Sequence, residues 1–71
     1  MAHTTADARR RTRVFRKTLA LFEGDREAAA TWLATAQPAL GGVVPIDLAK
    51  TDGGARDVET LIEQLEHGVF P

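Results

Sequence analysis

Cysteine is absent from this 71-residue chain, and histidine occurs only twice. Without cysteine, neither a disulfide nor a thiolate metal site can stabilise so small a protein. His3 and His67 stand at opposite ends of the chain and are not spaced as a metal-binding pair. We therefore expect no metal site and no cofactor.

Long apolar runs are also missing. No unbroken apolar stretch approaches the length of about 20 residues that spans a membrane. The arginines near the start are followed by no continuous apolar segment of the kind found in a signal peptide. We expect a cytoplasmic protein that makes no contact with membranes.

The chain is short even for one domain, and it holds 18 large apolar side chains. A single core rarely supplies more than about 3–5 kcal/mol below about 70–80 residues. A two-domain enzyme is therefore excluded, and no nucleophile is paired with a base as acyl transfer requires. We expect a protein that is not an enzyme and that gains stability from a partner or from self-association.

The net charge of −1 conceals two halves of opposite sign. Residues 1–20 carry six cationic side chains against Asp7 and sum to +5, whereas residues 21–71 sum to −6. A basic arm on an acidic body is typical of a nucleic-acid contact or of an end whose charges face solvent. The arm lacks the Asn and Gln side chains that commonly read bases.

Apolar spacing predicts an all-α fold, a small compact bundle of three to four helices with a basic N-terminal arm and a short apolar C-terminal tail. Helices are expected over residues 7–23, 26–36, 45–50 and 53–67. The expected stripes are Phe15, Leu19 and Phe22, then Ala29, Trp32, Leu33 and Ala36, and finally Val58, Leu61, Ile62 and Leu65. We assign residues 1–13 to the arm and residues 14–71 to the domain.

Caps and turns set the expected boundaries. Gly24 and Gly68 fit the left-handed position that ends a helix, and Asp25 fits the N-cap of the second helix. Pro38 ends that helix, and Pro45 suits the first turn of the third. Either Thr51 or Asp52 should cap the fourth helix, and Leu40 should anchor the intervening loop in the core.

Several features allow two interpretations. Glu59, Glu63 and Glu66 follow one helix face, which is either a solvated face or a surface for a basic partner. Trp32 is either a core residue or part of a partner interface. Gly41 and Gly42 favour a tight turn over a phosphate loop, because no strand precedes them and no lysine follows. The tail of Val69 and Phe70 either folds back onto the core or projects into the cleft of a partner.

The order of these motifs resembles the toxin-binding C-terminal domain of Xre/MbcA/ParS-type antitoxins over about residues 14–70. The residues that carry this resemblance are Gly24, Asp25, Trp32, Leu33, Pro38, Leu40, Gly41, Gly42, Pro45 and Gly54, followed by the run Glu66, His67, Gly68, Val69 and Phe70. The resemblance implies a bacterial α-helical protein that inhibits a RES-domain toxin, an enzyme that consumes NAD⁺.

In such antitoxins the C-terminal end lies at or over the toxin's active site, which implies that the cognate RES-domain toxin is the partner and that the protein dimerises. The residues expected to bind toxin are Glu63, Glu66, His67, Gly68, Val69, Phe70 and Pro71. Members usually carry an N-terminal helix-turn-helix that binds DNA, and this sequence has none before its first motif. We therefore expect DNA binding only where a helix-turn-helix is supplied elsewhere, with a small DNA-binding regulator acting through the basic arm as the alternative function.

Overall fold

A computed structural model describes residues 2–68 of the chain, with side chains from residue 6 onward. These residues form four α-helices and one 3-10 helix. They are α1 (Ala2–Leu21), α2 (Arg26–Leu33), the 3-10 helix η1 (Pro38–Leu40), α3 (Pro45–Leu48) and α4 (Asp52–His67). The only extended pairing in this part of the chain is an isolated bridge between Gln37 and Val43. The prediction of a small all-α fold is confirmed.

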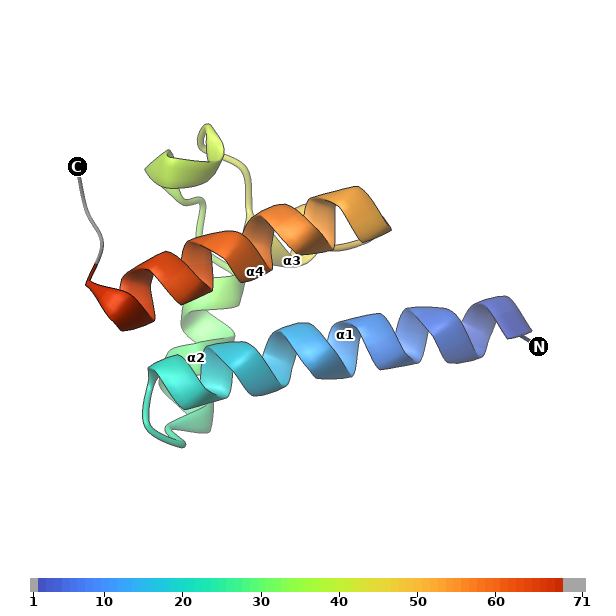
Figure 1. Cartoon of the computed structure of the whole chain (residues 1–71), viewed down its shortest axis with the longest axis horizontal. Helices are drawn as coiled ribbons and strands as arrows, with labels where there is room; N and C mark the ends of the chain where they lie inside the picture. Colours follow the sequence, from blue (N-terminus) through green and yellow to red (C-terminus); the bar gives the residue numbers. More distant parts are fainter. Residues whose placement is uncertain (1, 69–71) are drawn as a thin grey trace.

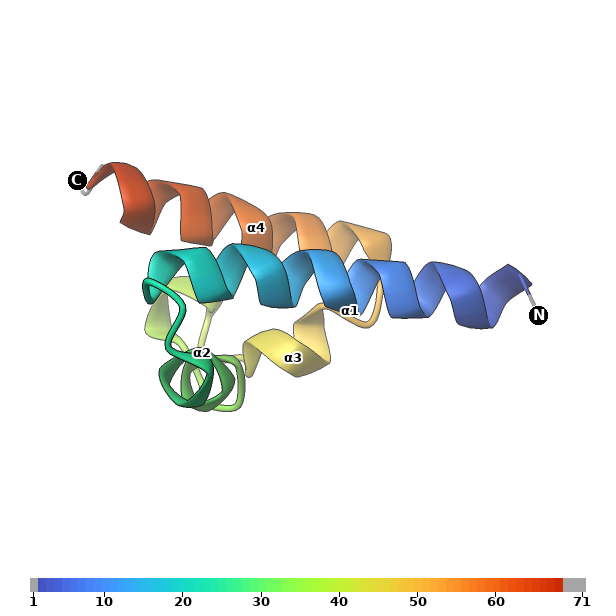
Figure 2. The same cartoon turned by 90° about the horizontal axis from the view of Figure 1, so that it is seen from below.

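The two long helices, α1 and α4, lie side by side and run in the same direction (Figure 1). The shorter elements between them cross behind the pair, so that α2 and α3 lie against one side of it (Figure 2). The first turns of α1 extend beyond the start of α4 (Figure 1). The Cα radius of gyration is 11.9 Å, while the longest dimension reaches 41 Å.

The core lies where α1, α2 and α4 meet. Its cluster of buried residues comprises Val14, Leu33, Ala49, Ala55, Val58 and Ile62. The predicted α4 stripe is confirmed at Val58, Leu61 and Ile62, which are all buried, and Leu65 is half-buried. Leu40 packs against the cluster from η1, as predicted for the loop anchor.

Helix α1 begins earlier and ends earlier than the predicted range of 7–23. Alanine and arginine favour helix strongly and are frequent near its start, which accounts for the earlier beginning. The predicted apolar stripe is displaced, because Val14 and Thr18 are the most buried side chains while Phe15, Leu19 and Phe22 are half-buried. Thr18 is buried without cost to hydrogen bonding, because its hydroxyl donates to the Val14 carbonyl oxygen at 2.8 Å.

The end of α1 adopts a Schellman turn. The Gly24 N–H donates to the Leu19 carbonyl at 2.9 Å, and the Glu23 N–H donates to the Ala20 carbonyl at 3.1 Å. These two bonds place Glu23, not Gly24, at the first position after the helix cap. Glu23 has a φ of 55° and Gly24 a φ of 87°, so the assignment of Gly24 to that position was wrong by one residue.

Helix α2 begins as predicted and ends three residues early. The Asp25 carboxylate accepts a hydrogen bond from the Ala28 N–H at 3.0 Å, which confirms the predicted cap. The helix stops at Leu33, and Ala36 is exposed instead of buried. The Gln37 side-chain amide donates to the carbonyl oxygens of Trp32 and Thr35 at 3.2 and 3.1 Å. It therefore provides hydrogen bonds to carbonyl groups at the C-terminal end of α2.

Helix α3 is shorter than its predicted range of 45–50. Pro45 occupies the first turn and is buried, as expected, but the helix ends at Leu48. Leu48 and Ala49 pack in the core, whereas Ile46 is 49% exposed and does not belong to the predicted buried face. An apolar side chain therefore remains on the surface beside α1.

The start of α4 is fixed by Thr51 and Gly54. Of the two predicted caps, Thr51 is the one used, because its hydroxyl accepts the Gly54 N–H at 3.0 Å. Gly54 is buried against the backbone of Leu48, and a Cβ at this position would overlap the Leu48 carbonyl oxygen. Glycine here allows α4 to pass directly against the end of α3.

Candidate functional site

The C-terminal end of α4 carries the predicted toxin-binding residues that lie within the described part of the chain. Glu63, Glu66 and His67 are all exposed in the last turns of the helix. Gly68 then adopts a left-handed conformation with φ of 65°, and its N–H donates to the Leu65 carbonyl at 3.4 Å. The predicted helix stop at Gly68 is confirmed. Val69, Phe70 and Pro71, the remaining members of the predicted site, lie outside the described residues.

The charged side chains at this end of α4 differ in how well they suit the helix dipole. The C-terminus of a helix favours cations and disfavours carboxylates. His67 in the last turn suits that field when it is protonated, whereas Glu66 opposes it. Glu66 forms no ion pair among the side chains that the structure describes. A cation from a partner would therefore find the Glu66 carboxylate uncompensated.

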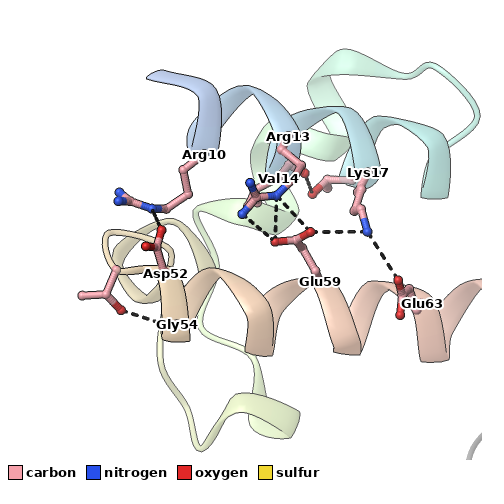
Figure 3. A network of polar contacts seen from close by, with 10 residues as sticks. Arg10, Arg13, Val14, Lys17, Asp52, Gly54, Glu59 and Glu63 are labelled. Atoms are coloured by element: carbon pink, nitrogen blue, oxygen red, sulfur yellow. Dashed lines mark hydrogen bonds and ion pairs between the residues drawn. The ribbon is translucent and has the colours of Figure 1, made fainter. Parts of the chain in front are cut away.

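Glu59 and Glu63, farther back on the same face, are paired with α1 (Figure 3). Glu59 accepts from Arg13 at 3.1 Å and lies 3.3 Å from the Lys17 ammonium. The same ammonium lies 3.3 Å from Glu63. The expected acidic face is thus partly neutralised inside the domain.

A second contact joins the middle of α1 to the start of α4. Arg10 donates to the Asp52 carboxylate and to the Lys50 carbonyl oxygen, each at 3.0 Å, and it also contacts Asp7 at 2.8 Å. Its side chain is only 12% exposed. We call the contacts of Arg10, Arg13 and Lys17 with α4 and with the Lys50 carbonyl the α1–α4 ladder.

Sequence reasoning missed this ladder. It considered the cations of the basic arm as exposed groups, and it looked for partners of the α4 carboxylates only within α4. The available signal was a matching periodicity, since Arg10, Arg13 and Lys17 share one face of α1 and Asp52, Glu59 and Glu63 share one face of α4. Pairing the two faces requires knowing that the helices are parallel neighbours.

The ladder also perturbs Lys17. Hydrogen bonds to the carboxylates of Glu59 and Glu63 raise the pKa of Lys17 above its ordinary value of 10.5, with the charges of the same carboxylates acting in the same direction. The ammonium form is therefore held firmly near neutral pH.

Trp32 contacts the core with part of its side chain and leaves another part on the surface. It is half-buried and packs against the core cluster. Its remaining surface lines a shallow open groove together with Phe22, Thr31 and Gln37. The groove is too open to enclose a small molecule in the way that ligand pockets do.

In the described residues, no group of three or more side chains of the metal-ligating types gathers in one place. None of the helices described combines the length and the apolar character needed to cross a membrane.

Comparison with known families decides the relationship. A family model described as the antitoxin Xre/MbcA/ParS C-terminal toxin-binding domain matches residues 18–68. The chain belongs to this family. The matched range contains the whole of α2, η1, α3 and α4, including Gly54 and the exposed end of α4. The family resemblance inferred from the motifs is confirmed.

Two curated relatives agree with the Xre/MbcA/ParS assignment. An "Antitoxin Xre" from Yersinia enterocolitica is 45% identical over 58 residues, which cover 82% of this chain and 39% of the relative. An "Antitoxin Xre" from Photorhabdus laumondii is 39% identical over 69 residues, which cover 92% of this chain and 47% of the relative. The chain thus spans less than half of the length of either relative. No solved structure matches it.

Proposed function

We propose that this domain is the toxin-binding part of an antitoxin, that it acts in the cytoplasm by binding and not by catalysis, and that its partner is a RES-domain toxin that consumes NAD⁺. The observation that carries the proposal is the match of residues 18–68 to the toxin-binding domain of Xre/MbcA/ParS antitoxins. The choice of a RES-domain toxin rests on the resemblance of the motifs to that family.

The C-terminal end of the chain is the proposed inhibitory element. A site that recognises the diphosphate of NAD⁺ should present cationic groups, because paired charges and hydrogen bonds favour phosphate binding. Glu66 offers such groups an exposed carboxylate with no ion-pair partner among the described side chains. The positive φ of Gly68 ends α4 directly before the tail. In this proposal the tail obstructs the toxin's cleft while Glu66 and Glu63 attract its cationic rim.

Deleting residues 68–71 tests the steric part of the proposal. The expected result is loss of inhibition in an assay of NAD⁺ consumption by the toxin encoded beside this protein. A pull-down with the same toxin, run in parallel, reports binding separately from inhibition. Undiminished inhibition by the truncated chain would contradict the proposed role of the tail, whereas failure of the full chain to bind the toxin would contradict the proposed partner.

The electrostatic part is tested by Glu66→Gln, with Glu27→Gln as the matched control. Both carboxylates are exposed, but Glu27 lies in the first turn of α2. If Glu66 meets a cationic group of the toxin, E66Q should weaken toxin binding about 3–30-fold, the range of an interfacial charge pair of modest burial. E27Q should leave the affinity unchanged. Equal affinities for the two variants would remove Glu66 from the interface.

Self-association is proposed as a second property of the domain. The exposed Ile46 borders a hollow lined by Val14, Phe15, Leu33 and Ala49, and this lining is almost wholly apolar apart from the neighbouring Arg11. Apolar surface of this kind is what a small domain with a thin core has available for pairing with a second copy. We therefore propose this surface for the expected dimer.

A further inference from the structure

The α1–α4 ladder divides the cations of α1 into two groups. Arg10, Arg13 and Lys17 point toward α4 and hold its carboxylates (Figure 3). Arg9, Arg11 and Arg16 are exposed and form no ion pair among the side chains described for residues 6–68. The cations that hold α1 against α4 are thus distinct from the cations that are available to bind a partner.

Two of the available cations lie on one face of the helix, and Arg11 lies apart from them beside the apolar hollow. Arg9, Arg13 and Arg16 follow an i, i+4, i+7 spacing, which places them on the same side of α1. Arg13 belongs to both groups, because it contacts Glu59 while its side chain stays 50% exposed. Together with Ala8 and Thr12 these residues line a shallow hollow along α1. We call Arg9, Arg13 and Arg16 the arginine stripe.

The composition of this surface indicates the chemistry of its partner. The side chains that line it are arginine and lysine, with small alanine and threonine between them, and no large apolar side chain lies among them. Protein interfaces generally depend on buried aromatic or aliphatic anchors, which are missing here. Binding to a nucleic-acid backbone depends instead on cations that neutralise phosphates.

The dimensions of the stripe fit a phosphate backbone. Seven residues of α-helix advance about 10.5 Å. Phosphates of one strand are spaced about 3.4 Å along the axis of duplex DNA, so the stripe spans about three of them. Guanidinium groups bind phosphate oxygens through paired hydrogen bonds, which lysine cannot reproduce. Arg9 and Arg16 are both exposed, so phosphates can reach this face of the helix.

We infer that the arginine stripe of α1 binds the phosphate backbone of duplex DNA without sequence preference. This function goes beyond toxin binding and uses one face of α1, whereas the proposed toxin-binding residues lie at the C-terminal end of α4 and beyond it. Sequence selectivity is not expected, because contacts to phosphates carry no direct information about the base sequence. The inference also reduces the set of DNA-contacting cations expected from the sequence, since the fold uses Arg10 and Lys17 for its own α4 contacts.

The test is fluorescence anisotropy of the full chain with a labelled duplex of arbitrary sequence, measured over a range of KCl concentrations. Three phosphate contacts predict a slope of about −2.7 for log affinity against log salt, which is a loss of about 40-fold between about 50 and 200 mM. The variant Arg9→Gln/Arg16→Gln should bind more weakly and reduce the slope to about −0.9.

The matched control is Arg26→Gln/Lys50→Gln, which removes the same charge at exposed positions outside α1. It should retain the parental slope. Circular dichroism of each variant verifies that the helices persist. Absence of binding to duplex at low salt would overturn the inference, as would equal slopes for the two double variants. Equal binding to poly-glutamate would overturn the assignment to nucleic acid and indicate an acidic protein partner.

Discussion

Gly54 shows at the scale of one residue how the sequence permits a close contact between backbones. It lies in α4 where the helix passes against the Leu48 carbonyl, and the neighbouring Gly53 has no heavy atom within 4 Å of the place where its Cβ would be. The two adjacent glycines therefore have different roles, which the sequence alone does not distinguish. The motif that includes Gly54 marks the position, but only the packing of α3 on α4 explains it.

Replacing Gly54 by alanine should destabilise the domain by at least about 3 kcal/mol, because the added methyl group can be accommodated only if α4 moves away from α3. Gly53→Ala is the control and should stabilise the domain by about 0.5–1 kcal/mol, since alanine favours helix at an unobstructed position. Urea unfolding followed by circular dichroism measures both. Similar losses in the two variants would show that the contact with Leu48 is unimportant.

Glu23 is notable for its left-handed backbone conformation. It is the one non-glycine residue with positive φ in the described part of the chain. Left-handed backbone costs a residue with a Cβ about 1–2 kcal/mol relative to glycine. Glu23→Gly should therefore raise the stability by about 1 kcal/mol, measured by thermal unfolding. Glu27→Gly, within the first turn of α2, should lower it by a similar amount, and a loss of stability in both variants would contradict the assignment of strain to Glu23.

At the scale of elements, the α1–α4 ladder joins two helices that the sequence presents as unrelated. Most of its ion pairs are partly exposed, and such pairs contribute about 0.2–1 kcal/mol each. Glu59 is the central member because it contacts both Arg13 and Lys17 and is only 15% exposed. The ladder therefore sets the register of the two helices more than it determines the total stability.

Glu59→Gln should lower the free energy of unfolding by about 0.5–1.5 kcal/mol, and the difference should shrink in about 1 M NaCl because salt screens the pairs. Glu66→Gln, in the same helix but without an ion pair among the described side chains, should cause no loss. Denaturant titrations at low and high salt provide the comparison. A loss in E59Q that is independent of salt would indicate altered packing and would contradict the electrostatic explanation.

The raised pKa of Lys17 gives the ladder a pH dependence in the alkaline range. A cation whose pKa is higher in the folded state stabilises the fold fully below its unfolded value near 10.5, and this contribution disappears as the pH rises through the raised value. The stability difference between the parent and Lys17→Gln should thus be constant near neutral pH and vanish once the pH exceeds the raised pKa of Lys17. Lys50→Gln is the control, since the Lys50 ammonium pairs with the exposed Asp47 at 3.6 Å and takes no part in the contact between the Lys17 ammonium and α4. A difference that persists at high pH would exclude the ammonium as its cause.

At the scale of the whole molecule, the sequence predicted the helices much better than their arrangement. The stripe of Val58, Leu61 and Ile62 and the caps at Asp25 and Gly68 are local signals, and the structure confirms them. The burial of Thr18 and the exposure of Ile46 depend on which helices become neighbours, so periodicity alone could not predict either one. For the same reason the sequence predicted a site at the end of α4 but did not reveal that Glu63 forms an ion pair with Lys17 of α1.

The apolar surface around Ile46 leads to a prediction for the assembled molecule. Ile46→Ser should weaken self-association at least about tenfold by removing the most exposed large apolar side chain of that surface. Val43→Ser is the matched control, because Val43 is 40% exposed but does not line the hollow beside α1. Sedimentation velocity over a concentration series measures both. A dimer unaffected by I46S would have to use another surface.

The parallel packing of α1 against α4 also determines when the domain can form during synthesis. Arg13 and Glu59 are 46 positions apart, so part of the core that α1 requires is supplied by a helix made well after it. Ribosomes add about 5–20 residues per second, which leaves α1 without its partner for about 2–9 s. During that interval Val14 lacks Ala55, Val58 and Ile62, the α4 members of its core cluster.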